Sequence, residues 1–354
     1  MAKLRFGVCG LGCMGRGHFA RLQKHPQAEV VAVCDTDEGR RNGDWNDELG
    51  NLDLITTESG RVPLDGIASY AKTDDLIADA NVDAVMIALP TILHAEVAAA
   101  AMEAGKHVLC EKPMAYRVGD CDRMMRAAET SGRTLMIAQC LRFWPEYEAI
   151  KRCVDEGRIG RVQYLAMRRL GSTPTYSAGG WLLDGRQSGG AILDLHVHDI
   201  DFAQHLLGLP TTIHAHGTPT ETDGIDHVIA AYGYADQSYA LIEGGWFEAA
   251  SWPFQMSIAV HGDKGSVEWG MTEGNKVLLH MRGSDKPEVV EARGDAYERE
   301  VDYFIRCVLG GESVDRCLPQ STRTSVALAW LERRSIETGR VIPVSERLRE
   351  VWSE

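Results

Sequence analysis

Residues 4–18, LRFGVCGLGCMGRGH, join a short apolar run to three glycines spaced as G-x-G-x-x-G. In a strand–turn–helix unit, the first glycine permits a tight turn and the second lets a pyrophosphate approach the backbone. The third lets the helix pack close to the strand, and the helix amino end favours phosphate charge. The motif therefore predicts a dinucleotide-binding turn, with contacts from Gly10, Gly12, Cys13, Met14 and Gly15.

A second apolar run, 29-EVVAVC-34, is followed by Asp35, which stands 20 residues after Gly15. A carboxylate at this point hydrogen-bonds the ribose hydroxyls of a dinucleotide. Thr36 and Asp37 follow, so no basic residue stands beside Asp35, and a 2′-phosphate would be repelled. NAD is therefore predicted rather than NADP. The alternative is that Asp35 only caps a helix or a turn.

The first part of the chain alternates short apolar runs with helix-like segments. Because the runs do not alternate in polarity, they predict buried parallel strands, and hence a doubly wound parallel sheet, the Rossmann architecture. The predicted strands are 4–9, 29–34, 82–89, 107–110 and 134–138, and the predicted helices are 15–24, 73–80, 94–104 and 117–131. Segment 42–70 is acidic and too long for a minimal connection. We interpret it as a surface insertion, with a lid as the alternative.

After residue 150 the predicted strands are longer and alternate in polarity, which indicates an α+β domain with an open, mainly antiparallel sheet. The predicted strands are 161–170, 211–217, 225–234, 238–247, 254–261 and 265–269, and the predicted helices are 145–156, 194–207, 295–309 and 320–338. The chain is thus predicted to have a dinucleotide-binding domain at 1–140 and a substrate-binding and oligomerisation domain at 141–354.

Composition narrows the class of protein. The 354 residues carry a net charge of −14, which disfavours nucleic acid and anionic membranes as partners. No apolar run reaches the ~20 residues that span a bilayer, and glycines interrupt the amino-terminal run, so neither a membrane helix nor a signal peptide is expected. Nine cysteines without a C-x-x-C pair predict reduced thiols and a cytoplasmic protein.

The stretch 189-GGAILDLHVHDID-201 concentrates titratable side chains. If a helix starts near Asp194, then Asp194 and His198 share one face, and His198 would accept a hydroxyl proton while Asp194 orients it or binds a neighbouring hydroxyl. The alternative is a capping aspartate beside a half-buried histidine. His196 and His198 would bind a metal from a strand, but on a helix they diverge, and no third ligand stands nearby at metal spacing. No metal is predicted.

Several stretches together resemble the Gfo/Idh/MocA family, named for glucose–fructose oxidoreductase and inositol dehydrogenase. They are GLGCMGRGH, 90-PTILH-94, 105-GKHVLCEKPM-114, 142-RFWP-145 and 189-GGAILDLHVHD-199. The resemblance covers nearly the whole chain. It implies an NAD(P)-dependent oxidoreductase of sugars, cyclitols and related polyols, and a second-domain sheet that is buried in dimers or tetramers.

The resemblance also implies roles for single residues. Lys112, Asp194 and His198 match the catalytic and substrate-binding set, with Pro113 shaping the turn that carries Lys112. Arg142 matches a substrate-binding position. Further cofactor contacts are implied for Pro90, His94, Glu111 and Lys112. The chain departs from the family pattern in the long segment 42–70, in Trp144, and in Leu141 where a second arginine often stands, which puts the substrate's anchoring in doubt.

These observations predict an NAD-dependent dehydrogenase that oxidises a secondary alcohol of a sugar or cyclitol. Lys112 would stabilise the developing carbonyl oxygen as a cationic donor. The alternatives are a glycosidase of the same family that recycles bound NAD, and a dinucleotide-sensing regulator without turnover. A homodimer or homotetramer is expected, because the alternating strands between 225 and 269 carry more apolar positions than nearby helices would cover.

Overall fold

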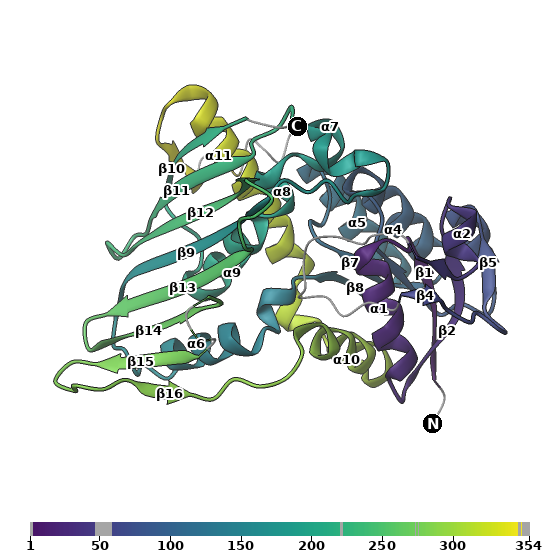
Figure 1. Cartoon of the computed structure of the whole chain (residues 1–354), viewed down its shortest axis with the longest axis horizontal. Helices are drawn as coiled ribbons and strands as arrows, with labels where there is room; N and C mark the ends of the chain where they lie inside the picture. Colours follow the sequence, from purple (N-terminus) through teal and green to yellow (C-terminus); the bar gives the residue numbers. More distant parts are fainter. Residues whose placement is uncertain are drawn as a thin grey trace. The chain divides into compact units, whose positions relative to one another are not determined.

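The computed structural model of the chain describes residues 3–46, 59–219, 222–272, 274, 276–345 and 348. Its contacts divide the chain into two compact units, each with a large sheet of its own (Figure 1). The first unit takes residues from 1–139, 174–181 and 297–323, and the second takes those from 140–173, 182–296 and 324–354. Two segments from later in the chain, 174–181 and 297–323, thus pack with the first unit.

The first unit is built on a six-stranded parallel sheet in the order β5-β2-β1-β6-β7-β8. The strands are β1 (Leu4–Cys9), β2 (Ala28–Cys34), β5 (Ala68–Tyr70), β6 (Ala84–Ile87), β7 (His107–Glu111) and β8 (Leu135–Ala138). Every residue of β6 and β8 is buried, as expected for strands covered on both faces. The predicted Rossmann architecture is confirmed.

Helices connect these strands, and all of them except α2 lie close to predicted helices. They are α1 (Cys13–Lys24), α2 (Glu38–Arg41), α3 (Thr73–Ala78), α4 (His94–Glu103) and α5 (Val118–Ser131), with the short 3₁₀ turn η1 (Thr91–Leu93) before α4. The sequence prediction missed β5, which is formed by the last residues of segment 42–70 and is the edge strand of the sheet. A two-stranded pair, β3 (Asp44–Trp45) and β4 (Gly60–Arg61), also belongs to this segment, and residues 47–58 lie outside the described part.

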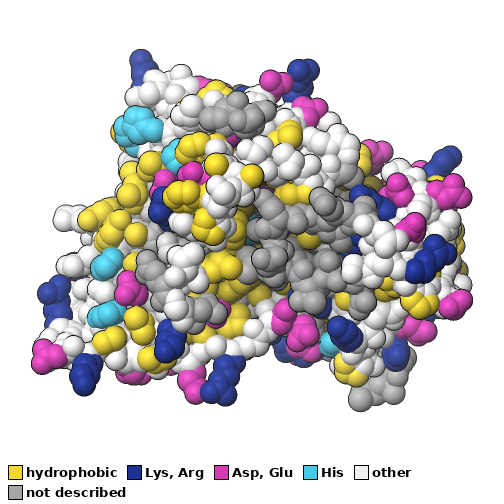
Figure 2. All heavy atoms as spheres, in the orientation of Figure 1, with side chains coloured by type: hydrophobic (Ala, Val, Ile, Leu, Met, Phe, Trp, Pro, Cys, Tyr) yellow, Lys and Arg dark blue, Asp and Glu magenta, His cyan; other side chains and the backbone are white. Residues whose placement is uncertain are grey.

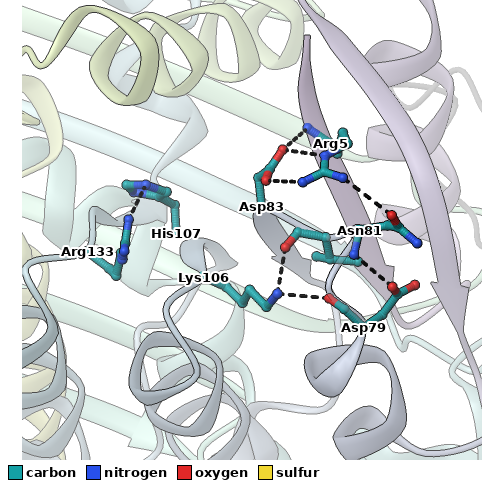
Figure 3. A network of polar contacts seen from close by, with 8 residues as sticks. Arg5, Asp79, Asn81, Asp83, Lys106, His107 and Arg133 are labelled. Carbon is teal, nitrogen blue, oxygen red and sulfur yellow. Dashed lines mark hydrogen bonds and ion pairs between the residues drawn. The ribbon is translucent and has the colours of Figure 1, made fainter. Parts of the chain in front are cut away.

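The edge where the parallel strands begin is closed by a polar network (Figure 3). At the start of β1, Arg5 donates from Nε and Nη2 to the two carboxylate oxygens of Asp83 at 2.9 and 2.7 Å. Lys106 Nζ donates to two backbone carbonyls at 2.8 and 2.7 Å, and Arg133 Nη1 lies 3.4 Å from His107 Nε2 at the start of β7. These charged side chains lie at the edge of the sheet opposite the glycine turn, and each forms hydrogen bonds with other groups of the protein there.

A helix from late in the sequence completes the first unit. In α10 (Ala296–Gly310), Phe304 is fully buried, and its ring centroid lies 6.0 Å from that of Phe6 in β1. Arg323 donates from Nη2 to Asp122 in α5 at 2.9 Å. This unit therefore depends on residues about 300 positions from the glycine turn.

The second unit is built on a nine-stranded sheet in the order β16-β15-β14-β13-β9-β12-β11-β10-β17. Among the described strands of this sheet, only β9 and β12 pair in parallel, so the prediction of a mainly antiparallel sheet is confirmed. The strands are β9 (Val162–Ser172), β10 (Thr212–Thr218), β11 (His227–Gly233), β12 (Tyr239–Glu248), β13 (Gln255–Gly262), β14 (Gly265–Gly270), β15 (Val277–Met281), β16 (Glu288–Val290) and β17 (Ile342–Pro343).

Helices cover one face of this sheet (Figure 1). They are α6 (Pro145–Asp155), α8 (Ala191–Asp194), α9 (Val197–Leu207) and α11 (Pro319–Thr338), and the 3₁₀ turn η2 (Cys140–Arg142) precedes α6. The short helix α7 (Gly185–Ser188) packs on α8. In this core, the Tyr147 ring of α6 lies edge-on to Phe202 of α9 at 4.8 Å and to Trp269 of β14 at 5.6 Å. These contacts fix α9, which carries His198, against the sheet.

The other face of the sheet carries exposed apolar side chains. Burial alternates strictly along β13, and the outward residues of β11 and β12 include Ile229, Tyr239 and Leu241, of which Tyr239 is 54% exposed. Figure 2 shows hydrophobic side chains with histidines among them over the strands at the left of the view. Within the described part of the second unit, no helix packs on this face.

None of the helices in the described ranges is both long enough and apolar enough to cross a lipid bilayer.

Candidate active site

Each of the three motif positions is glycine for a different structural reason. Gly10 has φ +90°, and a Cβ there would lie 2.2 Å from the Ala88 carbonyl oxygen. A Cβ at Gly15 would lie 1.8 Å from the Gly10 carbonyl oxygen, so helix α1 packs directly on the turn. Gly12, the residue before α1, has no atom within 4 Å of a Cβ position. The open side of Gly12 and the amino end of α1 fit a pyrophosphate, which needs close approach to backbone N–H groups.

Asp35 lies at the end of β2 beside this turn. Its Oδ2 accepts a hydrogen bond from the Leu11 N–H at 2.8 Å, and its Oδ1 accepts from the Asp37 N–H at 2.8 Å. The carboxylate is half-buried, and a ribose placed over the glycine turn would meet it. Asp35 thus ends β2 and is bound to the glycine turn, and its contact with a ribose stays a prediction.

A basic residue near Asp35 was missed by the sequence analysis. Helix α2 turns the chain back, so that Arg41 Nη1 donates to the Thr36 carbonyl at 3.1 Å. A guanidinium thus lies against the residue that follows Asp35. The clue in the sequence is the short distance from Asp37, which caps α2, to Arg41 in its last turn.

Lys112 follows directly on β7, at the same carboxyl edge as the glycine turn. It is half-buried, and the peptide bond between Lys112 and Pro113 is cis. Glu111 is nearly buried, and both of its carboxylate oxygens have partners within the first unit. Oε1 lies 2.8 Å from His18 Nε2, and Oε2 accepts from the Lys112 N–H at 3.1 Å. Glu111 therefore links α1 to the backbone of Lys112.

Cys13 in the glycine turn is a poor nucleophile. Burial, and then the charge of Glu111, raise the pKa of this thiol to about 11. At neutral pH the group is protonated, so it contributes shape rather than charge to the turn.

Pro90 and His94 lie in the connection from β6 to α4. Pro90 precedes η1 and is half-buried, whereas His94 is 1% exposed. His94 Nδ1 lies 2.9 Å from the Pro113 carbonyl oxygen and Nε2 lies 2.8 Å from that of Leu89. The imidazole therefore contacts two backbone segments.

In the second unit, Gly189 and Gly190 have φ values of +81° and +76°. A Cβ at Gly190 would lie 2.8 Å from the Ile225 backbone nitrogen and 3.1 Å from Gly224 Cα. The sequence predicts that this Gly-Gly pair lets the backbone pass close to cofactor and substrate, and this stays a prediction. Its close approach is to the segment that leads into β11.

The helix predicted over 194–207 is present from Val197 to Leu207, but its predicted start at Asp194 is wrong. Helix α8 ends at Asp194 and α9 begins at Val197. The His196 N–H reaches back to the Ala191 carbonyl at 2.8 Å, which spans five residues and interrupts the regular ladder. Asp194 and His198 are both half-buried, but they belong to two different helices and so do not share one helix face.

The two neighbouring histidines have different surroundings. His196 is fully buried, and its Nε2 lies 3.1 Å from Oε2 of Glu332, whose Oε1 accepts from the Tyr232 hydroxyl at 2.6 Å. His198 is partly exposed, and its Nδ1 lies 3.8 Å from the Cys140 thiol. His196 therefore belongs to the core, and His198 does not share its surroundings.

Arg142 lies in a buried ion pair. It donates from Nε and Nη2 to Asp201 Oδ2 and Oδ1 at 2.8 and 2.7 Å, and Ser325 Oγ also donates to Asp201 at 2.8 Å. Arg142 is 3% exposed. This bidentate pair ties η2 to α9 and leaves the substrate-binding role of Arg142 as a prediction only.

A second buried pair holds the same helix. Arg169 Nε in β9 donates to Asp199 Oδ2 at 2.7 Å. Burial alone would lower the pKa of Arg169, but the charge of Asp199, the neighbouring Tyr147 and the hydrogen bond to Asp199 together raise it. Two carboxylates of α9, on either side of Ile200, therefore anchor the helix that carries His198.

Within the described ranges, no three His, Cys, Asp or Glu side chains gather closely enough to hold a metal ion.

Comparison with known proteins gives the context of this geometry. Residues 4–139 match the model of an oxidoreductase family with an NAD-binding Rossmann fold, and residues 147–268 match the GFO/IDH/MocA C-terminal domain. An NAD-binding oxidoreductase is the class that the fold and the glycine turn define. The chain belongs to the Gfo/Idh/MocA oxidoreductase family.

Three relatives illustrate the range of this family. The chain is 26% identical to myo-inositol 2-dehydrogenase of Thermotoga maritima, over 97% of this chain and 99% of that protein. It is 27% identical to 2,7-anhydro-N-acetylneuraminate hydratase of Escherichia coli, over 76% and 68%. The solved structure of the WlbA dehydrogenase of Bordetella pertussis, in complex with NADH and UDP-GlcNAcA, is 25% identical with a TM-score of 0.78, over 96% and 98%.

Proposed function

We propose that this protein is an NAD-dependent dehydrogenase that oxidises a secondary alcohol of a sugar, cyclitol or related polyol. The observation that carries the proposal is the link from α1 through His18 and Glu111 to Lys112. It joins the helix of the glycine turn to the lysine that would meet the substrate. The membership of the family supports the same reading.

Different residues of the first unit would bind different parts of the cofactor. Gly10, Gly12 and Gly15 with the adjoining Cys13 and Met14 would hold the pyrophosphate, and Asp35 would hold the ribose. Pro90 lies at the carboxyl edge of the sheet, where the nicotinamide half would lie. When bound, NAD supplies the hydride acceptor for the oxidation. Glu111 and His94 act through the backbone, because their polar atoms contact protein groups.

The proposed preference for NAD depends on the charge of Asp35, which would repel a 2′-phosphate. Arg41 opposes this preference, because its guanidinium lies against the Thr36 carbonyl. We expect Asp35 to dominate, since Arg41 is held by that carbonyl and the carboxylate is held by the glycine turn.

The chemistry requires a cationic donor, a base and an orienting group. Lys112 would donate to the substrate oxygen and lower the cost of its developing negative charge. His198 would accept the hydroxyl proton as the carbinol carbon loses its hydride. Asp194 would orient the imidazole or bind a neighbouring hydroxyl. The carbinol would thus become a carbonyl: its proton would pass to His198, and bound NAD would supply the acceptor for its hydride.

An NADH-absorbance screen over myo-inositol, other cyclitols, aldoses, sugar acids and nucleotide sugars tests the proposal. We expect steady NADH production with at least one class.

His198→Ala should lose about 10²–10⁴-fold in kcat, the usual contribution of a general base. His196→Ala is the matched control for imidazole loss, and we expect a smaller effect on kcat together with a lower melting temperature. Lys112→Met should be at least as slow as His198→Ala while still binding NAD. Equal kcat losses in the two histidine variants would contradict the assignment of the base, and full activity of Lys112→Met would contradict that of the cationic donor.

The relative named as a hydratase favours a second candidate, in which NAD is reduced and reoxidised within one turnover. Such an enzyme would be purified with bound cofactor and would release no net NADH. Product analysis by mass spectrometry with anhydrosugars and glycosides separates this outcome from dehydrogenation. Cofactor binding without any turnover would instead indicate a dinucleotide-sensing regulator.

We also propose that the protein forms homodimers or homotetramers through the uncovered face of the nine-stranded sheet. Ile229, Tyr239 and Leu241 are exposed there, and large apolar faces of this kind mark association surfaces. Light scattering at micromolar concentration should give a multiple of 39.0 kDa. Leu241→Lys should shift the mass toward the monomer, and a monomeric wild type would contradict the proposal.

A further inference from the structure

Two buried histidines contact the residues on either side of Lys112. His18, in α1, contacts the side chain of Glu111, and His94, at the start of α4, contacts the backbone of Pro113. We propose that His18 and His94 are positioning residues that fix Lys112 through its two neighbours. This inference rests on the proposed role of Lys112 in the reaction.

The contact from His18 reaches the backbone of Lys112 through one carboxylate. His18 Nε2 lies 2.8 Å from Glu111 Oε1, and the other oxygen, Oε2, accepts from the Lys112 N–H at 3.1 Å. The His18 side chain is fully buried and that of Glu111 is 7% exposed. Because no water competes at such a site, the carboxylate orientation is set by its protein partners.

His94 acts on the other side. Its Nδ1 lies 2.9 Å from the Pro113 carbonyl oxygen, and its Nε2 lies 2.8 Å from the Leu89 carbonyl oxygen. Burial is the main reason that the pKa of His94 is lowered, so the ring is neutral and carries one N–H. A neutral ring can donate to only one of these two carbonyl oxygens. The proposal requires the N–H on Nδ1, where it donates to the Pro113 carbonyl, rather than on Nε2, where it would donate to that of Leu89.

The two contacts restrain the backbone both before and after Lys112. A reacting group held in this way keeps its geometry without further loss of entropy during the reaction. Loss of either contact should leave the fold and the glycine turn in place but let the lysine shift. A shift of this kind lowers kcat more than it weakens cofactor binding.

Asparagine and glutamine distinguish the two ring nitrogens. The asparagine amide nitrogen is three bonds from Cα, as is histidine Nδ1, whereas the glutamine amide nitrogen is four bonds away, as is Nε2. At position 94, where Nδ1 meets Pro113, asparagine should preserve activity and glutamine should not. At position 18, where Nε2 meets Glu111, the order should be reversed.

The experiment measures kcat, KM and the NAD dissociation constant for His94→Asn, His94→Gln, His18→Asn and His18→Gln. The two mismatched amides should lower kcat by about 10²-fold, the effect of a displacement of about 1 Å. The two matched amides should stay within about fivefold of wild type, a smaller loss than that displacement causes. NAD affinity should be nearly the same in all four. The matched control is His107, at the opposite end of β7, where both amides should give the same kcat.

Hydrogen exchange of the peptide 107–116 gives a readout that does not depend on turnover. Exchange should be faster in the mismatched variants than in the matched ones. Equal kcat and equal exchange for the two amides at each position would overturn the inference, even with Lys112→Met inactive. If exchange is faster in the mismatched variants but Lys112→Met is fully active, His18 and His94 do fix the backbone around Lys112, and the proposed role of Lys112 in the reaction is wrong.

Discussion

Gly12 and Gly15 belong to one motif, yet alanine should have opposite effects at the two positions. A Cβ at Gly15 would lie 1.8 Å from the Gly10 carbonyl oxygen, more than 1 Å inside the 3.0 Å that real Cβ atoms respect. The obstacle is backbone, so helix α1 must move away from the turn. Overpacking of this kind costs about 1–3 kcal/mol. With about 2–4 °C per kcal/mol, Gly15→Ala should lower the melting temperature by several degrees.

Gly12→Ala should fold as well as the wild type. A Cβ there meets no atom within 4 Å, and the residue has φ −75°, which alanine adopts without strain. Removing a glycine from the unfolded chain even stabilises the fold by about 0.4–1 kcal/mol. The new methyl group would instead occupy the space into which the pyrophosphate must come. If that contact costs about 1–3 kcal/mol, NAD binding should weaken roughly 5- to 150-fold.

The assay pairs thermal denaturation of cofactor-free protein with titration calorimetry of NAD. Gly12→Ala should retain its melting temperature and lose affinity, while Gly15→Ala should lose stability first. Wild-type NAD affinity in Gly12→Ala would refute the reasoning, because the open side of Gly12 would then not be the pyrophosphate site. An unchanged melting temperature in Gly15→Ala would show that the turn yields at little cost.

Three further predictions concern charge. Asp35→Ser should raise the ratio of kcat/KM for NADP over NAD, and an unchanged ratio would mean that Asp35 does not meet the ribose. Asp201→Asn leaves Arg142 buried without its counter-charge and should cost about 3–5 kcal/mol in chemical denaturation, whereas a loss below 1 kcal/mol would show that the pair is solvated. Burial lowers the pKa of His94 below its usual 6.5, so the unfolded chain binds its proton first as the pH falls, and stability should decrease below about pH 6.5. Between pH 7 and pH 5, the melting temperature of His94→Asn should fall less than that of the wild type. An equal fall in the two proteins would contradict the lowered pKa of His94.

Much of the parallel sheet could be predicted because its strands are continuous apolar runs bounded by glycine or proline. Strand β5 escaped prediction, since Ala68–Tyr70 has no such run and gains its place by pairing with β2. The antiparallel strands β15 and β16 were missed for a similar reason, as they are short and follow turn-rich segments.

The candidate site was predictable where a motif has a local mechanical reason, and not where a side chain has a distant partner. Gly10, Gly12, Gly15 and Asp35 act within one strand–turn–helix unit. Arg142 pairs with a carboxylate 59 residues away, and no local pattern encodes that distance. The break between α8 and α9 escaped for a related reason, because the sequence from 191 to 207 is compatible with one continuous helix.

The late arrival of α10 has a consequence for biosynthesis. A ribosome that has made the six strands of the parallel sheet has not yet made residues 297–323, which pack with them. During translation, Phe6 is made long before Phe304, which packs against it, and Asp122 is made long before Arg323, with which it forms an ion pair. The nascent parallel sheet therefore lacks this packing while strands β9 to β16 of the second sheet are being synthesised. A fragment that ends near residue 140 should bind chaperones and aggregate rather than fold as a free nucleotide-binding domain.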